Sequence, residues 1–230
     1  MADPPLKPAQ AADAAAELAA AEADALGRAW WRRVPRVLTA PREVYRALRR
    51  TDEADVAARA EPVLAITILA GMAAVLLTPA WGRLGNDPTV DGLVIAVVTF
   101  IAGVFYGAAG YFVLGLALWI GAKAVGVDVT ARIARQLIGF SALPVALSIV
   151  VLVPVIALGF GEDWFRSGGD DEGSARAVVV GLGLAFVAWT LALVAYGSRV
   201  TFRLPWLGVV GALALGSVIV AGFAVLPLAL

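Results

Sequence analysis

Five long, uncharged apolar segments constrain the fold of this chain more than any other feature of its sequence. Each is long enough for a helix that crosses about 30 Å of hydrocarbon, which takes about 20 residues, and none contains Asp, Glu, Lys or Arg. Because hydrocarbon offers no hydrogen-bond partners, a spanning segment must satisfy its own backbone as a helix. The sequence therefore predicts an all-α polytopic membrane bundle with five transmembrane helices, at 62–80, 92–122, 136–160, 177–198 and 204–230.

The chain divides into three regions by composition. Residues 1–27 are rich in alanine and acidic side chains, which predicts a disordered tail or an Ala-rich helix. Residues 28–61 are rich in arginine and predict cytoplasmic, interfacial amphipathic helices. Residues 62–230 form the membrane domain, and we expect Pro62 to begin its first span because the missing N–H would be unpaired there anyway.

Short amphipathic helices are predicted within the basic region. Apolar residues recur at helical spacing from Trp30 onward with arginines between them, and Pro35 limits the helices to short pieces. We expect Thr39 to be the N-cap of the second helix, with Pro41 in its first turn. Aromatic rings and arginines in this pattern are typical of the membrane interface. The region is thus either a docking surface for anionic lipid or a partner protein, or an ordinary juxtamembrane anchor.

The basic residues set the expected orientation. With the N-terminus in the cytoplasm, fifteen of the 18 Lys and Arg residues fall in inside segments. Cytoplasmic loops carry an excess of Lys and Arg, so this orientation is favoured. We therefore expect a multi-pass protein of the cell (plasma) membrane with a cytoplasmic N-terminus and the C-terminus outside.

The sequence lacks the residues that most chemistry requires. It has neither cysteine nor histidine, and its predicted spans carry no ionisable group for proton coupling or catalysis. Asp163, Asp170, Asp171 and Glu172 share an outside loop, but its glycines make a solvated loop the simpler interpretation than a cation site. We expect no enzyme activity, no cofactor and no metal.

Two prolines interrupt the third predicted span. Pro144 and Pro154 each remove a backbone hydrogen bond, which predicts helix kinks near Ser141 and Ser148. The kink is either a static bend or a hinge beside a polar pocket. In the second span, the Gly103–Gly107 step predicts close approach of another helix, with packing inside the bundle favoured over a homo-oligomer seam.

Three short motifs occur in an order and spacing that resemble a known membrane family. They are LTAPREVYRAL at 38–48, VDVTARIARQLIGFSALPVAL at 127–147 and VAWTLALVAYGSRV at 187–200. Together with the five-span pattern they resemble the Yip1 domain family. The first is similar to its amphipathic entry helix, the second to its polar loop and Ala-Leu-Pro-like step, and the third to its fourth span.

The resemblance implies a membrane protein that acts through partners or on membrane shape. Eukaryotic members influence vesicle traffic and bind small GTPases, whereas some bacterial relatives look like accessory parts of export systems. The Asp-Leu-Tyr-Gly-Pro motif of eukaryotic members is absent here, so GTPase binding is not carried over. The alanine, arginine, valine and glycine bias favours a bacterial source.

We therefore expect a non-enzymatic membrane scaffold, adaptor or membrane organiser. The alternative is a small permease or transport subunit with a path beside the third span, lined by Ser141, Ser148, Tyr106 or Tyr196. The expected partners are the bilayer, anionic headgroups at the cytoplasmic face and a membrane-protein partner or second copy, but not nucleic acid. The residues predicted to form this interface are Trp30, Trp31, Arg42, Tyr45, Arg46, Arg132 and Arg135.

Overall fold

The computed structural model of the chain describes residues 30–49, 53–77, 86, 90–161, 164 and 174–225. Every regular element within these ranges is a helix, which confirms the predicted all-α fold. The tail predicted over 1–27 lies outside the described residues, and so do the four acidic residues of the outside loop.

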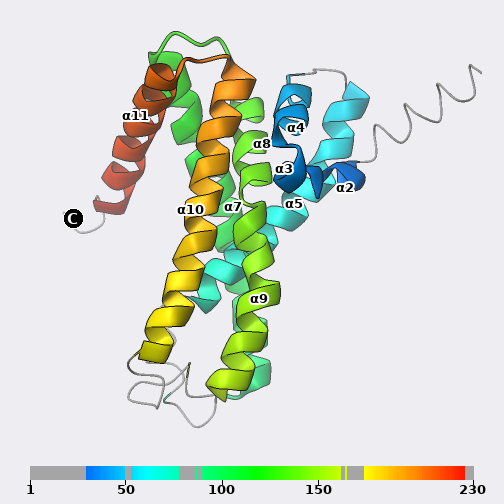
Figure 1. The fold of residues 1–230 in the computed structure, drawn as a ribbon, viewed down its shortest axis with the longest axis vertical. Coiled ribbons are helices and arrows are strands. Elements are labelled where there is room, and N and C mark those ends of the chain that lie inside the picture. Colours follow the sequence, from blue (N-terminus) through cyan, green and yellow to red (C-terminus); the bar gives the residue numbers. More distant parts are fainter. Residues whose placement is uncertain are drawn as a thin grey trace, which may run out of the picture.

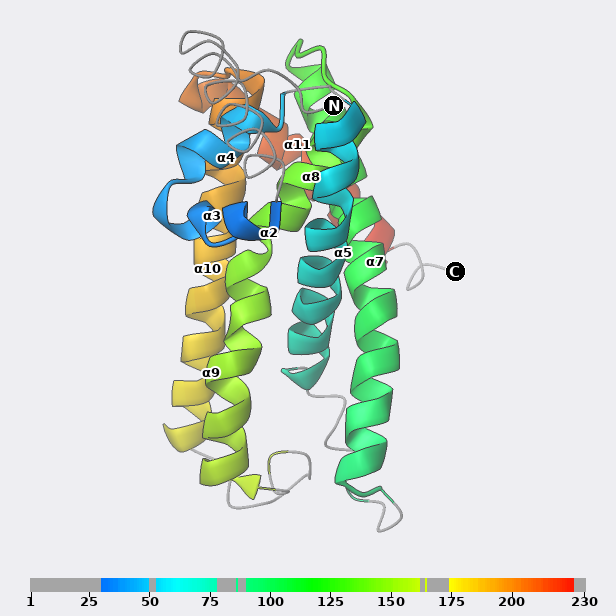
Figure 2. The same cartoon turned by 90° about the vertical axis from the view of Figure 1, so that its right-hand side faces the viewer.

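Six helices form the body of the molecule (Figure 1). They are α5 (Glu53–Leu76), α7 (Gly92–Ala124), α8 (Ala131–Ser141), α9 (Leu143–Gly159), α10 (Ser174–Phe202) and α11 (Trp206–Val225). Figure 2 shows α8 and α9 following one another along the long axis, with α5 beside α7 and α9 beside α10. α11 begins next to the end of α10 and packs against α7.

Four stretches of the described residues are helical, apolar and long enough to cross a membrane. They are Ala58–Leu76, Gly92–Ala124, Ala131–Gly159 and Arg176–Phe202. These stretches overlap the first four predicted spans, and they identify a membrane-type protein by length and composition. The apolar part of α11 that can be judged, Trp206–Val218, is shorter. The fifth span therefore stays a prediction.

The predicted break in the third span lies just before Pro144. α8 ends at Ser141, Ala142 forms a turn, and α9 begins at Leu143 with Pro144 in its first turn. Proline is tolerated at that position because its missing N–H would have no partner there anyway. Pro154, in contrast, lies inside α9, which runs through it to Gly159.

Two predicted helix boundaries are wrong. α5 begins at Glu53 and continues through Pro62, so this proline does not start the span. The preceding segment is rich in alanine, the strongest helix former, and one missing hydrogen bond does not end the helix. The N-cap of α4 (Pro41–Ala47) is Ala40, not Thr39, although Pro41 does lie in the first turn. The Thr39 hydroxyl instead donates to the Pro35 carbonyl at 3.5 Å.

Glycines bring α5 and α7 into backbone contact. A methyl group at Gly71 would lie 2.1 Å from the Gly103 carbonyl oxygen, and one at Gly107 would lie 2.2 Å from the Thr67 carbonyl oxygen. Such distances leave no room for any side chain. The Gly103–Gly107 step therefore packs inside the bundle, as expected. Gly121 makes a similar approach to Ala212 of α11.

The short amphipathic helices bury their apolar sides against the bundle. They are α2 (Trp30–Arg33), α3 (Arg36–Thr39) and α4, and Figure 1 shows them on its flank beside α8 and α10. Trp30 and Tyr45 are at most 1% exposed and belong to one hydrophobic core with Phe140 and Leu193. These two predicted interface residues are therefore core residues, because the helix face that could enter lipid is covered by protein. Trp31 is exposed.

Candidate functional site

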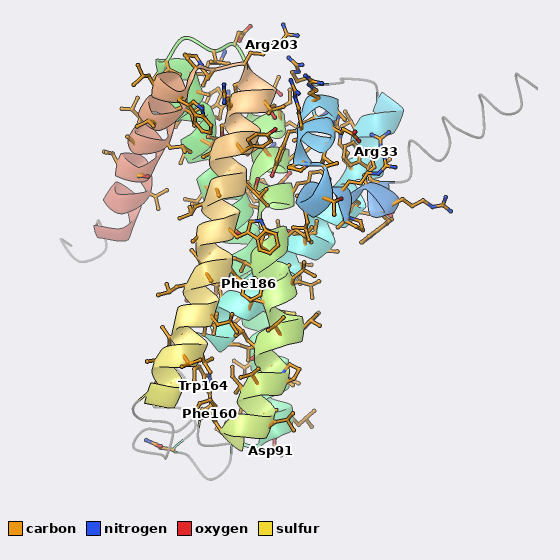
Figure 3. The ribbon with its side chains drawn as sticks, in the orientation of Figure 1. Arg33, Asp91, Phe160, Trp164, Phe186 and Arg203 are labelled. Atoms are coloured by element: carbon orange, nitrogen blue, oxygen red, sulfur yellow. The ribbon has the colours of Figure 1, made fainter. Side chains whose placement is uncertain are left out.

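Five arginines line one cavity between α4 and the end of α10. They are Arg42, Arg46, Arg49, Arg199 and Arg203, called the arginine cluster below. The cavity has a volume of about 440 Å³, and Tyr196 and Val200 complete its lining. Figure 3 labels Arg203 at this end of the molecule, and Asp91, Phe160 and Trp164 at the opposite end. The structure thus joins α4 to residues about 150 positions further along the sequence.

The arginine cluster carries an unbalanced positive charge. Among the described residues, none of its five guanidinium groups has a carboxylate within 4.0 Å. Nearby acidic side chains are engaged elsewhere, since Glu43 lies 3.9 Å from Arg36 and Asp128 contacts Lys123. That contact lowers the pKa of the Asp128 carboxyl. Guanidinium groups collected in this way bind carboxylate or phosphate through parallel hydrogen bonds.

Tyr45 fixes the position of α4, the helix that carries two of these arginines, Arg42 and Arg46. Its hydroxyl lies 2.8 Å from the Ser141 hydroxyl oxygen, and its carbonyl oxygen accepts from the Thr201 hydroxyl at 3.1 Å. Gly197 leaves room for the ring, because a methyl group there would lie 2.9 Å from it. Burial raises the pKa of the Tyr45 hydroxyl, which therefore stays neutral. One side chain thus links α4 to both α8 and α10.

Arg132 and Arg135 lie in a different place, at one end of a groove between α5, α7 and α8. This lateral groove has a volume of about 720 Å³, and most of its lining is apolar. Arg135 rests on aromatic rings, with its guanidinium carbon 5.1 Å from the Phe112 ring centre and 5.9 Å from that of Tyr111. The other lining residues are Val56, Ala60, Val63, Leu64, Thr67, Ile68, Val104, Ala108 and Gln136.

A smaller cavity joins the arginine end of the lateral groove. This head cavity has a volume of about 350 Å³ and shares Arg132, Arg135 and Gln136 with the groove. It adds Arg59, which is buried and donates to the Leu48 carbonyl at 3.1 Å. Its remaining lining residues are Val56, Thr130 and Ile133. A chamber lined by three arginines therefore opens onto an apolar groove.

Comparison with known families agrees with this architecture. A family model described as the Yip1 domain matches residues 36–228, which is most of the chain. The chain belongs to the Yip1 domain family. No curated protein and no solved structure matches it. The match begins at α3 and includes both sites, so the arginine cluster and the lateral groove are features of this Yip1 domain.

The Yip1 domain separates the predicted interface residues into two groups. Arg42 and Arg46 belong to the arginine cluster, whereas Arg132 and Arg135 belong to the lateral groove. Tyr45 lies beneath the arginine cluster as a buried support. The four arginines predicted for the interface therefore line two different cavities.

The polar residues predicted for a transport path do not line these cavities together. Ser141 is fully buried against Tyr45, and the Ser148 hydroxyl donates to the Val145 carbonyl at 2.6 Å within its own helix. Tyr106 is exposed, and only Tyr196 lines a cavity described above. Within the described ranges no group of three or more Asp or Glu side chains is placed to hold a metal ion.

Sequence reasoning missed part of both sites. From the sequence, Arg199 and Arg203 contribute only to the charge that sets the orientation, and Arg59 and Gln136 have no predicted role. Arg59 had one available signal, because it is a lone cation among alanines immediately before an uncharged span. Such a residue must find a polar partner as its helix enters apolar surroundings.

Proposed function

We propose that this Yip1 domain protein is a non-enzymatic membrane scaffold or adaptor that binds an acidic segment of a partner protein through the arginine cluster. The observation that supports the proposal is the set of five guanidinium groups around one cavity with no carboxylate partner among the described residues. Five like charges held together repel one another. An arrangement of this kind gains stability when an anion binds.

The surroundings of the arginine cluster indicate a binding site for a partner and not merely a solvated charged surface. α4 is held by the Tyr45 contacts to Ser141 and Thr201, so its arginines project from a fixed helix. The Arg199 guanidinium carbon lies 4.7 Å from the centre of the Trp206 ring, which limits its freedom. Preorganised side chains lose less entropy on binding than free ones. A partner carboxylate would therefore meet donors that are already in place.

The orientation expected from the basic residues puts the arginine cluster on the cytoplasmic side of the cell membrane. There it is accessible to cytoplasmic proteins and to cytoplasmic tails of other membrane proteins. Electrostatic complementarity of this type increases association rate and specificity, and salt weakens it. The proposed interaction is consequently one that decreases as ionic strength rises.

The test is affinity purification of the tagged protein in native-membrane nanodiscs after chemical crosslinking. We expect a stoichiometric protein whose crosslinked segment is acidic and whose recovery falls with added salt. Arg46→Glu should weaken its binding at least about fivefold, because a reversed charge removes an attraction of about 1 kcal/mol. Arg32→Glu is the matched control: it makes the same charge change on exposed α2, outside the arginine cluster.

The proposal fails if Arg46→Glu and Arg32→Glu weaken the interaction equally, since total charge and not the cluster would then be responsible. It also fails if no stoichiometric partner is recovered while a deletion strain loses a measurable solute flux. The latter result would support the permease alternative.

A further inference from the structure

The lateral groove has the shape and lining of a site for an amphipathic molecule. Its volume of about 720 Å³ falls within the range of about 300–1,000 Å³ that is common for ligand sites. On α5, residues such as Val63, Leu64 and Ile68 recur at helical spacing and form one wall. On α7, Val104, Ala108 and others form the opposite wall. Both walls lead away from α8.

Charge is confined to one end of the lateral groove. Among the residues that the structure describes, Arg132 and Arg135 are the only charged ones that line it, and both lie in the first turns of α8. Arg135 immediately precedes the uncharged segment that begins at Gln136. In a spanning helix this is the level at which headgroups meet hydrocarbon. The cationic end of the groove and its apolar length therefore match the two parts of a membrane lipid.

Gln136 provides an independent sign that the head cavity is built for a polar ligand. It is 4% exposed, it lines both the lateral groove and the head cavity, and its amide oxygen has no hydrogen-bond partner among the described residues. Burying an amide oxygen without a hydrogen-bond partner is unfavourable. A hydroxyl or ammonium donor of a lipid headgroup would satisfy it.

We propose that the lateral groove binds one anionic glycerophospholipid. Its phosphate contacts Arg132 and Arg135, a polar headgroup atom donates to Gln136 in the head cavity, and one acyl chain lies between α5 and α7. Guanidinium groups suit this role because their N–H donors match two phosphate oxygens at once. The site is distinct from the arginine cluster and independent of the partner proposed for it.

The experiment compares phospholipid retention and thermal unfolding in nanodiscs of two compositions. One contains phosphatidylcholine alone, and the other contains equal amounts of phosphatidylcholine and phosphatidylglycerol. Native mass spectrometry of the released protein should show one phosphatidylglycerol per chain, with a higher midpoint of unfolding in the anionic discs. The double variant Arg132→Gln/Arg135→Gln should lower apparent affinity at least about tenfold, because the charged hydrogen bonds to the phosphate are lost.

Two matched controls separate the groove from general surface charge and from misfolding. Arg46→Gln/Arg203→Gln removes the same charge from the arginine cluster and should leave retention unchanged. Ala108→Trp should block the groove and abolish retention, whereas Ala109→Trp, at the next exposed position but outside the groove lining, should not. If the groove double variant fails to fold, the two tryptophan variants decide the question.

Three results would overturn the assignment. If phosphatidylcholine and phosphatidylglycerol are retained equally, the groove does not select an anionic lipid and the arginines do not determine binding. Equal loss in the two double arginine variants would indicate nonspecific attraction of anionic lipid. If inorganic phosphate added to neutral discs raises the midpoint of unfolding as much as the anionic discs do, the site binds an anion and the acyl chain has no role.

Discussion

The arginine cluster and the lateral groove use the same side chain in different surroundings. In the arginine cluster, five arginines line one cavity together with Tyr196 and Val200. In the lateral groove, two guanidinium groups lie at the end of an apolar channel, and one rests on aromatic rings. The first arrangement fits a soluble anionic segment and the second an amphipathic molecule. What an arginine recognises is set by the neighbours that the fold gives it.

The most damaging change should be one that separates the helices of the lateral groove. Gly107→Val would place side-chain atoms against the Thr67 carbonyl, where a methyl group already comes within 2.2 Å. Overpacking of this kind costs about 1–3 kcal/mol, and more where backbone must move. We expect a lower midpoint of unfolding and loss of phospholipid retention, measured in nanodiscs.

Gly110→Val is the control for this change, because a methyl group there meets nothing within 4 Å. The fraction of the Gly107→Val protein that folds should still bind the partner through the arginine cluster. If partner binding falls in parallel with phospholipid retention, the two sites are not independent and the comparison between them is wrong.

The arginine cluster has a different weak point, which is the buried contact beneath it. Tyr45→Phe leaves the Ser141 hydroxyl buried without its partner, and an unsatisfied buried group costs about 1–3 kcal/mol. Thermal unfolding should show this loss, and partner binding should weaken because α4 is less firmly held. Adding Ser141→Ala should recover part of the stability, giving a coupling energy in a double-mutant cycle. Tyr106→Phe, at an exposed tyrosine, should have little effect.

A structural feature of this molecule can be predicted from the sequence when it depends on one stretch of chain, and not when it depends on packing between distant helices. The first four spans follow from apolar length alone, because hydrocarbon requires a helix whatever lies beside it. The break before Pro144 follows from the chemistry of a single residue. Tyr45 is different, because a helix lying on lipid and a helix docked on protein have the same amphipathic pattern. Only the packing of α4 against α8 and α10 shows which surface it covers.

The sites themselves could be predicted only in part, for the same reason. Arg42 and Arg46 were found from local arginine density, but Arg199 and Arg203 join them through the end of α10, far along the sequence. The separation of Arg132 and Arg135 from that group depends on which side of α8 faces α5 and α7. No spacing within the sequence encodes that choice, because it depends on how α8 packs against α5 and α7, which are separate helices of the bundle.

The stability of the protein at alkaline pH tests whether Tyr45 is a core residue. Burial raises the pKa of its hydroxyl above the ordinary value of 10.0, so the folded state keeps a proton that the unfolded state releases. The stability linked to this proton is fully present below pH 10.0 and decreases as the pH rises above it. The free energy of unfolding should therefore fall above that pH more steeply in the wild type than in Tyr45→Phe. Parallel curves for the two proteins would contradict this role.

The smallest expected effect is the change in stability on removal of one arginine, which should be an increase at the arginine cluster and a decrease at the lateral groove. Arg42→Gln removes one of five like charges from the arginine cluster at an exposed position, so it should increase the free energy of unfolding slightly, by up to about 0.5 kcal/mol. Added salt should abolish the difference, because screening weakens repulsion between exposed charges. Arg135→Gln, measured in anionic nanodiscs, should instead lower stability, because it removes a contact to bound lipid. A stabilising effect of both substitutions would mean that both sets of arginines are merely unpaired charges, and that neither site has a resident anion.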